Sequence, residues 1–182
     1  AASNKSATRT VTMEMNQTAQ TIWALKGTKI SVTNPISIGS TEQWLTKSNT
    51  VPVQSGVSFG FTYYHQYWLN VTGGQVNSQW YNSSDTAQIS VPGVNGRLLG
   101  TGQRLTSYSI DIDFPIQVQP TLGTVNILIA MNNAHQLKIN AVRQYQVALD
   151  DSASKAASSI SPPTINGDAY WYDEGTQVRV VL

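Results

Sequence analysis

Apolar and polar residues alternate with a period of two along most of this chain. The side chains of a β-strand point alternately to its two faces, so the pattern predicts strands with one buried face. The longest stripe contains the odd-numbered residues from Phe59 to Val71, and another contains the even-numbered residues from Tyr108 to Val118. Further stripes run from Val125 to Met131, from Leu137 to Leu149 and from Val178 to Leu182. Helical periodicity is nearly absent, so we expect an all-β protein.

Turn-forming residues separate these stripes, as in Pro92-Gly93-Val94-Asn95-Gly96 and Asp173-Glu174-Gly175. Many short strands with one buried face are typical of an antiparallel β-sandwich, of the immunoglobulin-like or pilin-like kind. The chain has 182 residues, which is enough for one domain with a substantial core.

The N-terminal stretch from Thr8 to Asn16 alternates strictly, with Val11, Met13 and Met15 on one face. A polar arm precedes it and no hairpin turn lies close by. The sequence therefore predicts a half-apolar strand that joins a sheet of its own subunit or of another copy. We expect residues 1–20 to form a tail and linker, and residues 21–182 to form a β-sandwich head.

Charged residues make up only 12% of the chain and the net charge is +1, so nothing favours nucleic acid or a membrane surface as a partner. No apolar run approaches the roughly 18 residues of a membrane helix, and there is no Cys. Acid unfolding mostly reflects protonation of paired carboxylates. Because carboxylates are few, we expect stability to change little between neutral pH and about pH 3.

The chain contains sequons for N-glycosylation at Asn4, Asn16, Asn70 and Asn82. All of them fall on polar strand faces, in a turn or in the leading arm, where a bulky glycan can face water. The chain also begins at Ala1, as a processed mature protein does. These features predict an extracellular protein with covalent N-glycans.

Residues with catalytic potential are few. His65 lies on a buried stripe, which favours a hydrogen-bonded core histidine, and His135 is expected to be solvated in a turn. Asp111 and Asp113 share one face, where solvent exposure explains them better than a carboxylate pair or a calcium site. We therefore predict no catalytic residue, no metal site and no cofactor, and we expect that the protein is not an enzyme. A secreted hydrolase with dispersed carboxylates is the alternative that an activity screen on glycans and peptides would test.

A faint internal repeat joins two segments of the chain. The strand Gln66–Val71 leads to Trp80-Tyr81-Asn82, and the strand Gln144–Leu149 leads to Trp171-Tyr172-Asp173. Duplication and convergent hairpin chemistry both explain the similarity, because Trp and Tyr favour strands and polar residues favour turns.

Taken together, the Val11-Thr12-Met13-Glu14-Met15 tail, the sequons and the Trp-Tyr turns resemble the thread pilins of thermoacidophilic archaea. The resemblance implies a type I pilin-like fold in a helical or linear homopolymer on the cell surface, which serves adhesion or cell–cell contact. Identical subunits would join head to tail by donor-strand complementation, with Val11, Met13 and Met15 as the donor residues. It also implies heavy N-glycosylation. Bacterial type I pilins usually carry a disulfide, which this chain lacks, and the bundling pili of other archaea are close neighbours.

A monomeric secreted adhesin or carbohydrate-binding module is the main alternative. Trp44, Tyr64 or Trp68 would then be sugar platforms, and the N-terminal strand would fold back into its own sheet. Size-exclusion chromatography separates this alternative from a polymerising subunit.

Overall fold

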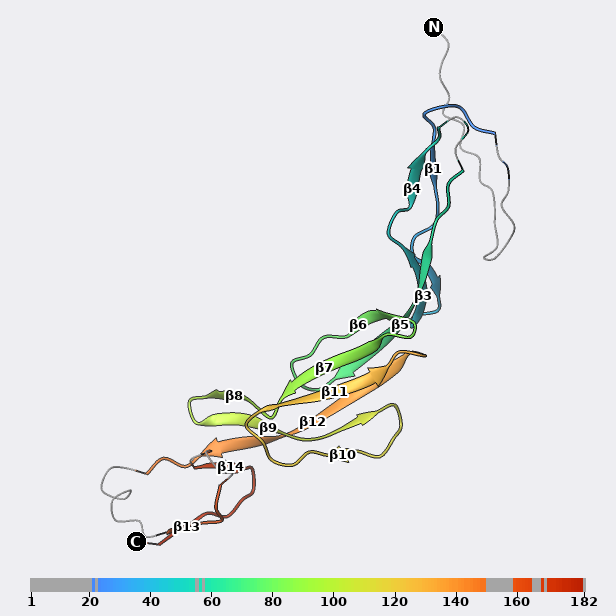
Figure 1. Cartoon of the computed structure of the whole chain (residues 1–182). Helices are drawn as coiled ribbons and strands as arrows, with labels where there is room; N and C mark the ends of the chain where they lie inside the picture. The colour runs from blue at the N-terminus through green and yellow to red at the C-terminus, as the bar shows by residue number, and fades with distance from the viewer. Residues whose placement is uncertain are drawn as a thin grey trace. The chain divides into compact units, whose positions relative to one another are not determined.

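The computed structural model describes residues 21, 23–54, 56, 58–149, 159–164, 168 and 170–181. These residues form strands and turns without a helix, which confirms the all-β prediction (Figure 1). The chain divides into two compact units, Ala1–Val32 with Thr50–Gly60, and Thr33–Asn49 with Phe61–Leu182. The predicted head, residues 21–182, is thus shared between two units. The predicted tail, residues 1–20, lies outside the described residues.

The first unit contains one antiparallel strand pair. In it, β1 (Lys29–Ser31) lies beside β4 (Thr50–Pro52), with Ile30 opposite Val51. The turn before β1 exposes two large apolar side chains, Trp23 and Leu25.

The second unit contains a large sheet with the strand order β10-β9-β12-β5-β3-β2. Its strands are β2 (Ile36–Ile38), β3 (Glu42–Thr46), β5 (Tyr63–Thr72), β9 (Thr101–Ile110), β10 (Ile116–Gln117) and β12 (His135–Gln146). Three short strands are added to it: β6 (Gln79–Asn82) on β5, β8 (Val94–Leu98) on β9 and β14 (Trp171–Asp173) on β12. One contact is parallel, between the start of β12 and the end of β5, whereas the others are antiparallel.

A second layer of two strands covers the middle of this sheet. It consists of β7 (Thr86–Pro92) and β11 (Thr124–Ala130), which pair antiparallel over seven residues. The two layers enclose the core, which confirms the sandwich. Its buried side chains are Leu69, Ala87, Ile89, Val91, Leu105, Ile127, Ile129, Met131, Leu137 and Ile139. A separate pair, β13 (Ser159–Ser161) and β15 (Arg179–Val181), lies near the C-terminus.

The stripe from Tyr108 to Val118 does not form one strand. The chain leaves β9 after Ile110 and turns, with the Asp113 N–H donating to the Ile110 carbonyl, before it returns as β10. Ile112 and Phe114 are 101% and 95% exposed, so the sequence alternation continues without a shared buried face. Asp111 causes the turn by adopting a positive φ of 55° and accepting the Gln136 N–H at 2.8 Å.

The similarity of the two segments extends to their strand register. In its first copy Tyr67 lies opposite Tyr81 and Gln66 opposite Asn82. In its second copy Tyr145 lies opposite Tyr172 and Gln144 opposite Asp173. The correspondence extends to the hairpins β2–β3 and β8–β9, because β3 pairs with β5 as β9 pairs with β12. Each copy is therefore a hairpin, a long central strand and a Trp-Tyr strand.

Candidate functional site

Two tryptophans and two sequon asparagines share one face of β5 and β6. Trp68 lies opposite Trp80, with ring centroids 5.2 Å apart and ring planes tilted by 58°. Asn70 follows on the same face of β5, and Asn82 follows on the same face of β6. We call Trp68, Asn70, Trp80 and Asn82 the tryptophan face. Both asparagines are exposed, and both rings are half-buried.

A chain of amides fixes the asparagine side chains. Gln43 donates to Gln66 at 2.9 Å, and Gln66 donates in turn to the Asn82 Oδ1 at 3.0 Å. The Ser78 hydroxyl donates to the Asn70 Oδ1 at 3.2 Å. The Nδ2 atoms of Asn70 and Asn82 have no hydrogen-bond partner among the described residues. This nitrogen is the atom that carries an N-linked glycan, and both asparagines are exposed.

The remaining predicted site residues lie in the part of the chain that the structure does not describe. They are the donor residues Val11, Met13 and Met15 and the sequon residues Asn4 and Asn16. The predictions about them stay predictions.

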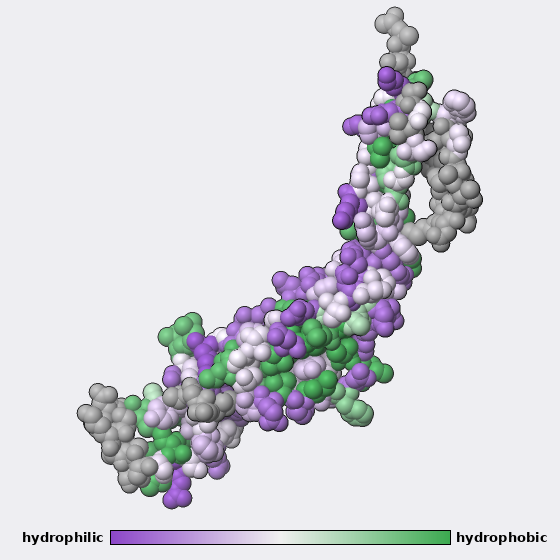
Figure 2. All heavy atoms as spheres, viewed as in Figure 1, coloured by the Kyte–Doolittle hydropathy of each residue, from purple (hydrophilic) through white to green (hydrophobic). Residues whose placement is uncertain are grey.

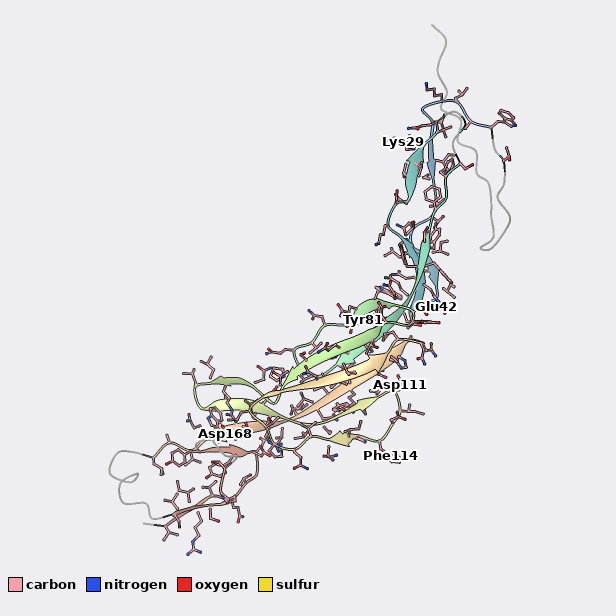
Figure 3. The ribbon with its side chains drawn as sticks, viewed as in Figure 1. Lys29, Glu42, Tyr81, Asp111, Phe114 and Asp168 are labelled. Atoms are coloured by element: carbon pink, nitrogen blue, oxygen red, sulfur yellow. The ribbon has the colours of Figure 1, made fainter. Side chains whose placement is uncertain are left out.

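The second copy of the repeat carries a buried charged network where the first carries neutral amides. Arg97 forms a two-pronged contact with Asp168, and its Nη2 donates to the Gln144 Oε1 at 2.6 Å. Arg104 likewise donates to both carboxylate oxygens of Asp173, and Gln144 donates to Asp173 at 3.0 Å. Asp168 and Gln144 are only 2% and 1% exposed. We call these five residues the charged network (Figure 3 labels Asp168).

Packing explains where Arg97 lies. Its guanidinium stacks on the Trp171 ring with the carbon 4.4 Å from the ring centroid. Gly102 leaves room beneath it, since a Cβ there would lie 2.5 Å from the Arg97 Cγ. The Arg97 Nε is buried and has no hydrogen-bond partner among the described residues. Because unpaired buried charge is costly, removing either acid should destabilise this copy strongly.

Arg104 lowers the pKa of Asp173 below its ordinary value by hydrogen bonding, and Gln144 adds to this against the opposing effect of burial. Burial also raises the pKa of Asp111, but hydrogen bonds from Gln136 and His135 outweigh it and lower that pKa. The acid response therefore depends on specific pairs that the count of carboxylates did not reveal.

Both histidines are paired with carboxylates. His65 contacts Glu42 at 2.7 Å and stacks on Trp44 with ring centroids 4.3 Å apart, so it is partly buried and hydrogen-bonded as predicted. The prediction that His135 is solvated is wrong. It begins β12, contacts Asp111 at 2.8 Å and has a side chain only 16% exposed, because the turn after β9 brings Asp111 to it. Asp113 is exposed, as predicted.

The loop between β9 and β10 presents an apolar surface. Ile112 and Phe114 are exposed in this loop, and Ile116 is exposed at the start of β10 (Figure 2 colours residues by hydropathy and Figure 3 labels Phe114). No group of three His, Cys, Asp or Glu residues within the described ranges is arranged to hold a metal ion. The same ranges contain no helix long and apolar enough to cross a membrane.

Compared with models of protein families, with curated proteins and with solved structures, the chain matches none.

Proposed function

We propose that the protein is the structural subunit of an extracellular pilus-like filament and polymerises head to tail by donor-strand complementation. The observation that carries the proposal is the N-terminal stretch with Val11, Met13 and Met15 on one face and no hairpin partner nearby in the sequence. In the filament this strand completes the sandwich of the neighbouring subunit. The filament serves adhesion or contact between cells and carries N-glycans.

The fold supports strand addition. Among the described residues, β7 and β11 in the second layer and β15 in the C-terminal pair each pair with one strand only. An open edge presents unpaired N–H and C=O groups that another strand can join. A head-to-tail contact of this kind does not close on itself and therefore builds fibres.

The donor residues supply the driving force. Burying the side chains of Val11, Met13 and Met15 should stabilise the contact by about 1.5–3 kcal/mol each. The ladder hydrogen bonds should contribute about 1 kcal/mol net each. The opposite face, with Thr10, Thr12 and Glu14, can remain in water.

Replacing Met13 with Asp tests the proposal, because it would place an unpaired charge in the neighbour's core at a cost of several kcal/mol, on the order of 2–7. Electron microscopy should then show heads without filaments. Thr12→Asp is the matched control on the other face and should leave filaments largely intact. Filaments assembled from a chain lacking residues 1–15 would contradict the proposal.

A monomeric carbohydrate-binding module is a second candidate, and the tryptophan face favours it. Aromatic rings beside amide groups suit a sugar, which offers both apolar ring faces and hydroxyls. A monomer on size-exclusion chromatography that binds a glycan, and loses it on Trp68→Ala, would support this function over the filament.

A further inference from the structure

One turn occurs three times among the residues that the structure describes. It begins at Trp23, Trp80 and Trp171 and leads into β1, β7 and β15. In each copy the third residue accepts a hydrogen bond from the N–H of the sixth. The donor–acceptor distances are 3.0 Å for Thr28 to Leu25, 3.1 Å for Asp85 to Asn82 and 3.0 Å for Thr176 to Asp173.

The backbone conformation repeats as well. The fifth residue of each turn has a positive φ, 86° at Gly27, 73° at Ser84 and 83° at Gly175. Residues other than glycine rarely adopt this conformation, so its recurrence at one position identifies the same local structure in all three copies.

The first two turns hold a neighbouring strand through the same pair of bonds. The Gly27 N–H donates to the Val53 carbonyl at 3.1 Å, and the Val53 N–H donates to the Thr28 carbonyl at 2.8 Å. The Ser84 N–H donates to the Met131 carbonyl at 2.9 Å, and the Met131 N–H returns to the Asp85 carbonyl at 2.8 Å. Val53 directly follows β4, and Met131 directly follows β11. β4 is the antiparallel partner of β1, and β11 is the antiparallel partner of β7.

The third turn lacks this neighbour within the described residues. The N–H of Gly175 and the carbonyl of Thr176 are the equivalent groups, and neither has a hydrogen-bond partner there. Val178 and Val180 occupy the places of Ala87 and Ile89, but they are half-buried where the latter are fully buried. β15 pairs with β13 along one edge, and a strand has two edges.

We propose that the N-terminal strand of a second copy of the chain fills this vacancy, as the third equivalent of β4 and β11. The inference rests on the proposed filament function and names its acceptor. The sequence of the strand fits the role. Thr10 to Asn16 reads Thr-Val-Thr-Met-Glu-Met-Asn, and the end of β11 with the residues after it reads Ile-Leu-Ile-Ala-Met-Asn. Met15-Asn16 then takes the place of Met131-Asn132.

This equivalence fixes the register. Met15 exchanges hydrogen bonds with Gly175 and Thr176, and the strands then run antiparallel. Counting outward, Met13 lies opposite Val178, Thr12 opposite Arg179 and Val11 opposite Val180. The apolar faces of both strands therefore coincide. Glu14 lies diagonal to Arg179 on the outer face, within reach of a long side chain.

Engineered cysteines test the register, because the chain has no Cys of its own. In this register Thr12 and Arg179 form a non-hydrogen-bonded pair of the antiparallel ladder. The two Cα atoms of such a pair are about 4.5 Å apart, a distance that a disulfide fits. The double variant Thr12→Cys, Arg179→Cys should give a ladder of covalent multimers on an oxidised, non-reducing gel, and the ladder should collapse to monomer on reduction. The variant Thr10→Cys, Arg179→Cys is two residues out of register and should cross-link several-fold less.

The possible results distinguish a failure of the proposed acceptor from a failure of the proposed filament function. The double variant could form filaments but give no ladder, and the second in-register pair, Glu14→Cys with Gln177→Cys, could give none either. That result would overturn this acceptor while leaving donor-strand assembly intact. A cross-linked monomer would show the strand on its own subunit and overturn the inference. Absence of filaments from the wild-type chain would overturn both proposals.

Discussion

At the scale of single residues, the charged network is the most consequential feature of the described chain. It places two arginines and two aspartates around Gln144, whose side chain bridges both ion pairs. Ion pairs on a surface contribute little, but the Asp168 side chain is only 2% exposed and that of Asp173 is 30% exposed, so Asp168 above all depends on its partner. The first copy of the repeat has Gln43, Gln66 and Asn82 at the corresponding place, so this amide cluster carries no charge.

The network predicts the response to acid. The pKa of Asp173 is lowered in the folded protein, so its contribution is present above the unfolded pKa of about 3.9 and is lost as pH falls through the folded value. Thermal midpoints should be nearly level from neutral pH to about 4 and should decline below that. Asp173→Asn should lower the midpoint at neutral pH and flatten the decline. Asp113→Asn is the exposed control, and an equal effect from it would contradict this assignment.

At the scale of strands and turns, a glycine directly after β5 allows the chain to lie close against β12. Gly73 has a φ of +76°, and a Cβ on it would lie 2.1 Å from the Ile139 carbonyl oxygen. Because that obstacle is backbone in the middle of a long strand, it cannot move aside cheaply. The close approach allows the parallel contact between β5 and β12 to form.

A comparison of two glycine variants tests this packing. Gly100 has a similar φ of +79° but nothing within 4 Å of an added Cβ. Gly100→Ala should therefore cost only the conformational strain, about 1–2 kcal/mol. Gly73→Ala should cost clearly more in denaturant unfolding, because the clash adds to the same strain. Equal losses in the two variants would show that the approach of Gly73 to Ile139 is not tight in solution.

The sequence predicted a strand correctly where one face of the strand is buried and the other is exposed along its whole length. β7 and β11 alternate without interruption, since one face of each covers the core and the other meets water. The prediction of one strand from Tyr108 to Val118 was wrong, because a turn at Asp111 reverses the chain without breaking the sequence alternation. Periodicity also could not place Arg97 beside Asp168, since they are 71 residues apart and no local pattern links them. The faint repeat was the available signal for Asp173, because it aligned that residue with Asn82.

At the scale of the whole molecule, the two copies of the repeat share topology and differ in surface chemistry. The first carries the tryptophan face with its two sequons. In the second, Asp173 replaces the asparagine of the Trp-Tyr turn, and the charged network lies nearby. Glycans would thus cover only one half of the repeat.

Glycopeptide mass spectrometry of native protein should therefore find carbohydrate on Asn70 and Asn82 and none on peptides from residues 93–182. Asn70→Gln and Asn82→Gln should each remove one glycan mass while leaving the fold intact, because both side chains are exposed. Unmodified Asn70 and Asn82 in native material would remove this support for an extracellular location.

The stagger of β5 and β12 also determines how the second unit responds to force. The end of β5, Leu69–Thr72, lies beside the start of β12, His135–Lys138, with both strands running the same way. Tension applied at Tyr63 and Gln146 loads these hydrogen bonds lengthwise, so they must yield together instead of opening one after another. β9 holds β12 by nine further register pairs along the same axis. Resistance to pulling then depends on the unfolding rate rather than on equilibrium stability alone.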